Sequence, residues 1–129
     1  MATVKTFEEL KCWQRARELV TLVYALTSTG NLARDFGMRD QLQRAALSVM
    51  NNIAEGFARE STKEFIRFLD ISHASCIEVK SMSYVLEDLK SVSETNIQTM
   101  RSKLDETSGL IRGLMKYLRS TSFNRSSEH

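Results

Sequence analysis

The stretch Gln41–Arg59, QLQRAALSVMNNIAEGFAR, decides the fold of this chain. Its apolar residues recur every three or four positions, which is the spacing of a helix, and they cover more than half of the helix circumference. A surface helix needs one apolar stripe, so this helix is expected to contact neighbours on two sides. Six of its polar residues fall on one line of the helix, and they are Gln41, Arg44, Ser48, Asn52, Glu55 and Arg59.

The composition of the whole chain indicates a single all-helical domain. The 129 residues include 42% hydrophobic residues and five glycines but no proline, the residue that breaks helices and punctuates sheets. A chain of this length can bury a real core without disulfides or metals. We expect one domain over 1–129, with an ordered part over 7–119 and a flexible polar tail over 120–129.

Helix start signals divide the chain into four helices. The predicted capping boxes are Thr6-x-x-Glu9, Ser61-x-x-Glu64 and Ser91-x-x-Glu94. The predicted helices span 7–29, 38–58, 62–90 and 94–119. A polar link over 31–37 joins the first two. Gly56 lies inside the second helix, where glycine costs about 1 kcal/mol relative to alanine, so we expect close helix packing there. Short links between long helices predict an antiparallel, up-down four-helix bundle.

The third predicted helix carries a second apolar stripe about a quarter turn from its core stripe. This second stripe consists of Ile66, His73, Ile77 and Tyr84. One bundle needs only one core stripe per helix, so the second stripe predicts an interface between subunits. The alternative is a wide core face with a few exposed apolar residues, which are common on monomers.

The polar line on the second helix has two interpretations. It is either a solvated face with weak contacts between successive turns or a hydrogen-bonded network between helices or subunits. In the network, Arg44 and Arg59 would pair with Glu55 or Glu78 through the planar guanidinium group. We favour the network, which is structural and not catalytic.

The charge pattern gives weak support for nucleic-acid binding. The net charge is only +2, whereas a strong nucleic-acid binder has a clearly basic surface. The candidates for a phosphate-facing patch are Lys11, Arg15, Arg39 and Arg44; the alternative for each is a solvated surface of mixed charge. No platform of exposed aromatic residues is predicted. The helical spacing places three aromatic side chains in the core, namely Trp13, Phe65 and Phe68.

The sequence predicts neither an enzyme nor a metal or cofactor site. His73 is the one histidine inside a predicted helix, and a lone histidine on an apolar stripe is more often a packed residue than an acid–base group. No nucleophile–base arrangement or metal-ligand spacing is present. Cys12 and Cys76 are interpreted as reduced thiols of a cytoplasmic protein. No stretch has the length of a membrane span or the pattern of a signal peptide.

Several short motifs in combination resemble a known family. They are F-x-x-L-x-x-W-x-x-A over 7–16, Q-L-x-R-A-A over 41–46, N-I-A-E-G over 52–56, Glu64-Phe65, Phe68-Leu69, and Ser75 with Glu78. Together they resemble the four-helix-bundle proteins encoded in intervening sequences of bacterial 23S ribosomal RNA genes. That family also includes the accessory variability determinant proteins of diversity-generating retroelements.

The resemblance implies a homopentamer of bundles around an axis and binding of RNA or DNA through a basic surface. It also implies a reverse transcriptase as a partner of the retroelement members, which are expected to be more basic than this chain. We therefore expect a non-enzymatic oligomeric adaptor that binds RNA or DNA with low sequence specificity. The alternatives are a protein–protein scaffold without a nucleic-acid partner, and a small enzyme with a site between subunits, which would need convergent titratable groups.

Overall fold

The computed structural model describes residues 4–128, with side chains described over residues 4–121. A short 3-10 turn, η1, spans Phe7–Glu9. The α-helices are α1 (Lys11–Thr27), α2 (Gly30–Arg34), α3 (Phe36–Phe57), α4 (Thr62–Asp88) and α5 (Glu94–Glu128). Residues 4–128 contain no β-strand, so the predicted all-α class is confirmed.

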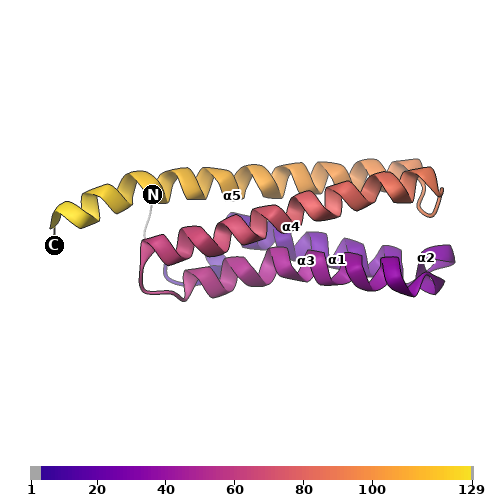
Figure 1. Cartoon of the computed structure of the whole chain (residues 1–129), viewed down its shortest axis with the longest axis horizontal. Coiled ribbons are helices and arrows are strands. Elements are labelled where there is room, and N and C mark those ends of the chain that lie inside the picture. Colours follow the sequence, from indigo (N-terminus) through magenta and orange to yellow (C-terminus); the bar gives the residue numbers. More distant parts are fainter. Residues whose placement is uncertain (1–3, 129) are drawn as a thin grey trace.

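The four long helices lie side by side (Figure 1). α3 packs against α4, α4 packs against α5, and α1 packs against both α3 and α5. A hydrogen bond of 2.9 Å from Gln43 to Thr27 joins the beginning of α3 to the end of α1, as expected for antiparallel neighbours. α5 extends beyond the other helices at its C-terminal end (Figure 1).

The core lies between these four helices and includes most of the apolar stripe predicted for the second helix. Its fully buried side chains include Leu19, Leu42, Ile53, Leu69, Leu104 and Ile111. Burying each such side chain stabilises the fold by about 1.5–3 kcal/mol before conformational entropy is counted. The half-buried Trp13 and Phe65 add edge-to-face ring contacts to Phe7 and Phe57, with centroid distances of 5.1 and 5.9 Å.

At Gly56, α3 lies close against the beginning of α4. A Cβ atom at this position would lie 2.7 Å from the Cβ of Phe68 and 3.0 Å from the Phe65 ring. The Phe68 Cβ is attached to the α4 backbone, so it cannot move away without displacing the helix. The prediction that Gly56 serves close helix packing is confirmed.

The first two predicted helices differ from the structure at their ends. The first predicted helix is interrupted at Leu10, whose extended backbone separates η1 from α1. Residues 30–34 form the short helix α2 instead of a polar link, because Leu32 is buried against the core. Gly30, at φ +64°, turns the chain between α1 and α2 in the left-handed region that glycine tolerates. Asp35 then caps α3 by accepting a hydrogen bond of 3.3 Å from Met38 N–H.

The predicted capping boxes have different outcomes. Glu9 accepts hydrogen bonds from the Lys5 and Thr6 N–H groups, as a capping box requires, but it caps η1 and not the long helix. Ser61 caps α4 by accepting from Glu64 N–H at 3.0 Å, whereas the Glu64 carboxylate pairs with Arg67. The second half of that box is therefore replaced by an ion pair.

The prediction that Ser91 caps the last helix is wrong. Ser91 N–H donates to Leu86 O at 3.0 Å and Lys90 N–H donates to Glu87 O at 3.1 Å, which closes α4. This closure places Lys90 at φ 53° and uses Ser91 for the end of α4. Ser93 caps α5 instead, because its hydroxyl accepts from Asn96 N–H at 3.2 Å.

The polar tail continues α5 as a helix to Glu128, beyond the predicted end at 119. The flexibility expected for residues 120–129 stays a prediction, and His129 lies outside the described residues.

Replacing glycine by alanine should have opposite effects at two positions. Gly56→Ala should lower the free energy of unfolding by at least about 1 kcal/mol, because overpacking outweighs the gain in helix propensity. Gly113→Ala should raise it by about 1 kcal/mol, because no atom lies within 4 Å of the added Cβ. Urea denaturation of the two variants measures both effects, and equal changes of the same sign would contradict the packing described here.

Candidate functional site

Part of the polar line on α3 faces α4 and forms hydrogen bonds to it. The hydroxyl groups of Ser48 and Ser75 are 2.8 Å apart, and Asn52 donates to the Ser48 hydroxyl at 3.0 Å. The fully buried Ser72 donates to Val49 O at 2.6 Å. This set of contacts, the α3–α4 polar seam, satisfies its own buried groups and therefore has a structural role.

The arginines of the polar line do not make the predicted ion pairs. Glu78 accepts a hydrogen bond of 2.9 Å from Gln41, which takes the place expected for an arginine. The Arg59 guanidinium lies over the Phe68 ring, 4.7 Å from its centroid, at the end of the seam. Arg44 and Glu55 are both exposed, and neither forms an ion pair with a described side chain.

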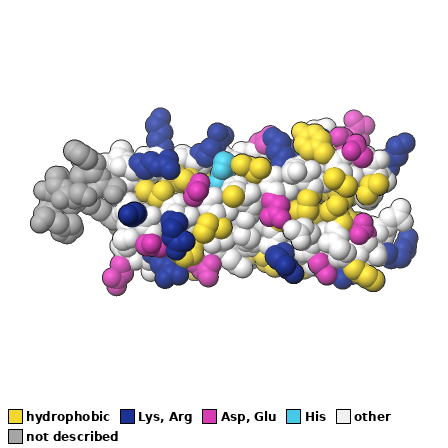
Figure 2. Space-filling view, viewed as in Figure 1, with side chains coloured by type: hydrophobic (Ala, Val, Ile, Leu, Met, Phe, Trp, Pro, Cys, Tyr) yellow, Lys and Arg dark blue, Asp and Glu magenta, His cyan; other side chains and the backbone are white. Residues whose placement is uncertain are grey.

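The second apolar stripe of α4 is divided between the protein interior and the surface. Ile66 is half-buried and packs against the core, and His73 is half-buried as well. Ile77 and Tyr84 have exposed fractions of 56% and 51%. Hydrophobic side chains over α3 and α4 are visible on the face shown in Figure 2. The structure thus leaves two predicted interface residues open on the outer side of α4, which we call the α4 outer face.

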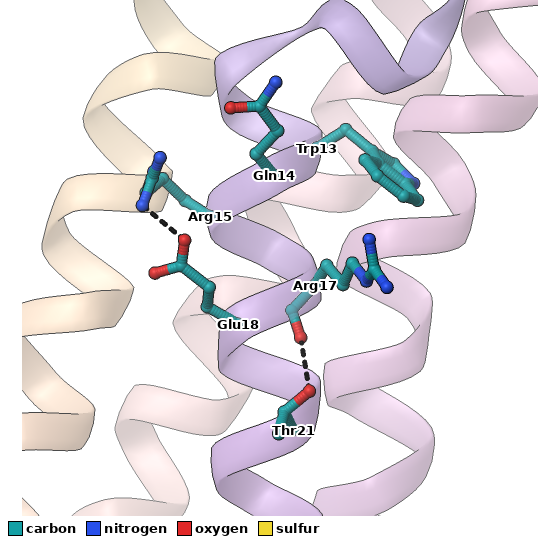
Figure 3. A pocket seen from close by; sticks show the side chains of 6 residues that line it. All are labelled: Trp13, Gln14, Arg15, Arg17, Glu18 and Thr21. Atoms are coloured by element: carbon teal, nitrogen blue, oxygen red, sulfur yellow. Dashed lines mark hydrogen bonds and ion pairs between the residues drawn. The ribbon is translucent and has the colours of Figure 1, made fainter.

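A shallow depression of about 470 Å³ lies on the polar side of α1 (Figure 3). Arg15 and Glu18 point to one side of this helix and form an ion pair, whereas Trp13 and Arg17 point to the other side. The Arg17 guanidinium lies 5.8 Å from the Trp13 ring centroid, and Gln14 donates to Glu8 O at 2.9 Å. Most of these side chains therefore already contact another residue of the protein.

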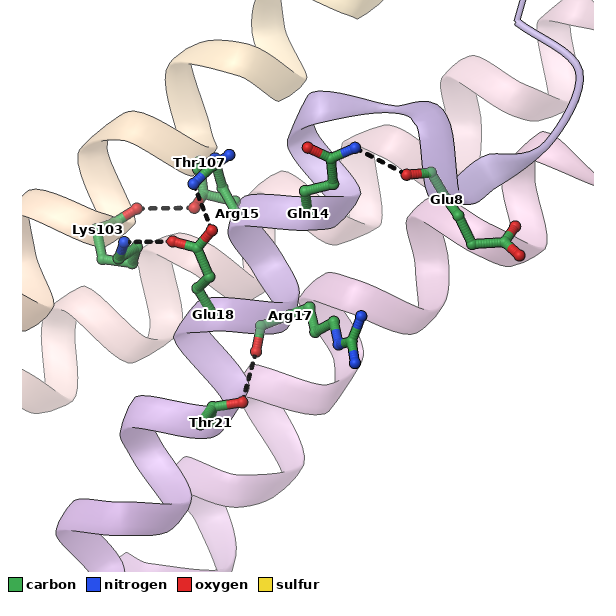
Figure 4. Close-up of polar contacts among 8 residues, drawn as sticks. All are labelled: Glu8, Gln14, Arg15, Arg17, Glu18, Thr21, Lys103 and Thr107. Carbon is green, nitrogen blue, oxygen red and sulfur yellow. Dashed lines mark hydrogen bonds and ion pairs between the residues drawn. The ribbon is translucent and has the colours of Figure 1, made fainter.

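An ion pair extends this group across to α5 (Figure 4). Lys103 Nζ lies 2.6 Å from Glu18 Oε1, and both side chains are partly exposed. The hydrogen bond from Lys103 lowers the pKa of Glu18 below its usual value. Desolvation opposes this shift, and the positive charges of Lys103 and Arg15 support it. Glu18 therefore joins α1 to α5 in its charged form.

The four cations predicted for a phosphate patch do not gather in one protomer. Lys11 begins α1, whereas Arg39 lies near Gln43, which bonds Thr27 at the end of α1. The sixteen-residue separation of Lys11 and Thr27 corresponds to about 24 Å along the helix. Arg39 also pairs with Asp40 at 3.1 Å, donates to Ala33 O and lies over the Phe36 ring.

A second groove, of about 520 Å³, lies between the beginning of α1 and the C-terminal half of α5. We call it the α1–α5 groove. Lys11 and Leu10 line one wall, and Leu110, Leu114 and Tyr117 line the other, with Gly109 and Gly113 beside them. Glu9 also lines the groove, but its carboxylate accepts from Lys5 N–H at 2.6 Å and Thr6 N–H at 3.1 Å.

Packing within the protomer does not require glycine at the two glycine positions of the α1–α5 groove. No atom lies within 4 Å of a Cβ added at Gly109 or Gly113, in contrast to Gly56. Each glycine inside a helix costs about 1 kcal/mol relative to alanine. The α5 backbone is therefore left open to a molecule outside the protomer.

Sequence reasoning overlooked a basic stripe beside these glycines. Arg112, Lys116 and Arg119 are exposed, and none forms an ion pair with a described side chain. A signal was available, because no Asp or Glu occurs between Glu106 and Glu128. Tyr117, with an exposed fraction of 37%, was overlooked as well.

The two cysteines are the candidate reactive groups, and Cys12 also lines the α1–α5 groove. Cys12 and Cys76 are free and buried, and burial raises their pKa values to about 11 and about 12. Both are therefore protonated thiols at neutral pH.

In the part of the chain with described side chains, no three His, Cys, Asp or Glu residues are arranged to hold a metal ion. None of the helices searched there is long and apolar enough to cross a membrane.

The fold and the polar seam define a small all-helical protein in which four long helices pack around an apolar core and buried hydroxyl groups join α3 to α4. A family model, described as 23S rRNA-intervening sequence protein, matches residues 8–113, and the chain belongs to this family. The family predicted from the sequence motifs is thus confirmed.

A comparison with solved structures supports the fold. The chain is similar to a protein of unknown function from the S23 ribosomal protein family of Bacteroides thetaiotaomicron, with a TM-score of 0.75 and 20% sequence identity. The match covers 81% of this chain and 95% of that chain. The comparison with curated proteins gives no match.

Glu18 should make stability depend on pH in the acid range. Its pKa is lowered in the folded state, so its contribution is present above pH 4.5, the usual value, and is lost as the pH falls through the folded-state pKa. Glu18→Gln should therefore lower stability at pH 7 and reduce the loss of stability on acidification. Denaturation at several pH values measures this, with Glu55→Gln as the exposed control. Identical pH profiles for both variants would exclude the Glu18–Lys103 contact as a stabilising one.

Proposed function

We propose that this protein is a non-enzymatic, self-assembling four-helix bundle that binds RNA or DNA with low sequence specificity. In this proposal the four long helices form an up-down bundle, and five copies associate around an axis, as the family resemblance implies. Nucleic acid is bound through phosphate contacts with exposed Lys and Arg side chains.

The α4 outer face supports the assembly. Ile77 and Tyr84 remain exposed although the core of the protomer is complete, and Ile71 and Val85 on the same helix are exposed at 39% and 42%. Exposed apolar side chains grouped on one helix are typical of a protein–protein interface. A second copy of the chain would remove these side chains from water.

The distribution of ion pairs carries the nucleic-acid proposal. Six cations are paired with carboxylates, namely Arg15, Arg39, Arg67, Lys80, Arg101 and Lys103. The exposed cations without such a partner among the described side chains include Lys11, Arg112, Lys116 and Arg119, and also Arg44, Arg59 and Lys63. On the face shown in Figure 2, Lys and Arg side chains occur along the whole molecule, with Asp and Glu side chains among them. When unpaired Lys and Arg side chains bind phosphates, counterions condensed on the nucleic acid are released, and this release favours binding at low salt.

A protein–protein scaffold without a nucleic-acid partner is the second candidate function. The six neutralised cations favour it, because they leave much of the surface evenly mixed in charge. A partner such as a reverse transcriptase would then bind the bundle through complementary polar and apolar contacts.

Replacing Ile77 by Glu should dissociate the assembly without unfolding the helices, because a charge would be buried at the subunit interface. Light scattering should give about five times the 14.7 kDa of one chain for the wild type and a smaller mass for Ile77→Glu. Circular dichroism checks helicity, and Gln98→Glu on exposed α5 surface is the control. A monomeric wild type, or an unchanged mass for Ile77→Glu, would contradict the interface.

Binding of a fluorescent oligonucleotide should weaken steeply with salt. Phosphate contacts predict a linear fall of the logarithm of the affinity with the logarithm of the salt concentration, for any base sequence. Anisotropy titrations from about 50 to about 200 mM KCl measure this dependence. Absence of binding at the lowest salt concentration would leave the scaffold as the remaining candidate.

A further inference from the structure

We propose that the α1–α5 groove binds a single strand of nucleic acid, with phosphates on the α5 cations and a base stacked on Tyr117. This inference rests on the proposed nucleic-acid binding and assigns it to one place. It differs from the predicted patch, of which only Lys11 lines this groove.

The cations of α5 form a line across the two glycines from Tyr117, on the side of α5 that also carries Arg101 and its contact with Glu87 of α4. Arg112, Lys116 and Arg119 are separated by four and three residues, so they share one face of the helix and span about 10 Å along it. Lys11 extends the positive charge to the opposite wall of the groove. These charges lie where a phosphodiester backbone following α5 would pass.

The α5 wall of the groove is apolar and offers a stacking surface. Leu110 and Leu114 line it beside Tyr117, the exposed aromatic side chain of this surface. Aromatic rings beside a positively charged groove are the usual elements of single-strand binding, because every base has a face that stacks. The volume of about 520 Å³ is within the range of small-molecule sites and is large enough for a base.

The open glycines lie between these two features. At about 100° per residue, Gly109 and Gly113 fall between Tyr117 and the cations around the α5 axis. The two glycines have no side chains, and no other atom of the protomer lies within 4 Å of a Cβ added at either position. A strand can therefore lie directly on the helix, with its bases toward Tyr117 and its phosphates toward the cations.

These features favour a single strand over a duplex. A duplex presents its phosphates to the cations, but its bases are stacked within the helix and cannot reach Tyr117 without being extruded. The same chemistry occurs in single-stranded RNA and single-stranded DNA, so both are tested. The probes are fluorescent twelve-nucleotide strands of uridine and of thymidine and a mixed-sequence DNA duplex of the same length.

The test compares full-length variants by anisotropy. Arg112→Gln/Lys116→Gln/Arg119→Gln should weaken single-strand binding more than about tenfold at 50 mM KCl and reduce the salt slope by about 2. The matched control, Arg39→Gln/Arg67→Gln/Lys80→Gln, removes the same charge from paired cations and should change the affinity less than about twofold. Tyr117→Ala should weaken binding at least about fivefold, while Tyr117→Phe and the distant Tyr24→Ala should retain it.

The outcomes separate this site from the proposed function. No binding of any probe by the wild type overturns nucleic-acid binding itself. Binding that the two triple variants weaken equally supports the function and overturns its assignment to the groove. Tighter binding of the duplex, with no effect of Tyr117→Ala, overturns the single-strand site. Circular dichroism and light scattering confirm that each variant keeps its fold and mass.

Discussion

The rest of the structure depends on the close approach of α3 and α4 at Gly56. A Cβ added at Gly56 would lie 2.7 Å from the Phe68 Cβ. The α3 backbone therefore packs directly against the first side-chain atom of Phe68, and no larger residue fits there. The polar seam of Ser48, Ser72 and Ser75 continues this contact along both helices. Steric fit and directed hydrogen bonds together fix the rotation of α4 about its axis. That rotation leaves Ile77 and Tyr84 on the outside.

The surface is divided by this arrangement into parts with different chemistry. The α4 outer face has exposed apolar side chains and suits a second copy of the chain. The α1–α5 groove combines an open glycine backbone, Tyr117 and Lys11, with the α5 cations across the glycines, and suits a polyanion with planar groups. The ion pairs of Glu18 with Lys103 and of Arg101 with Glu87 hold α5 to its two neighbouring helices, so the groove has defined walls.

The sequence predicts the helical class, the core and the role of Gly56 well, because periodicity reports burial directly. It fails at Ser91, where a hydroxyl residue closes one helix instead of starting the next, and at residues 30–34, where burial of Leu32 outweighs local polarity. The pairing of Gln41 with Glu78 depends on the relative rotation of two helices, which no local pattern contains. The basic stripe of α5 was visible as a run without acidic residues, but its position beside a groove required the fold.

Hydrogen–deuterium exchange with and without a single-stranded oligonucleotide tests most directly whether the assembly and binding surfaces are separate. At a protein concentration that maintains the assembly, the nucleic acid should slow exchange in residues 4–12 and 109–121. Exchange in residues 71–85 of α4 should stay the same, because in the proposed assembly a second subunit and not nucleic acid covers that face. Slower exchange confined to residues 71–85 would contradict the account, since it would place the nucleic acid on the surface assigned to assembly.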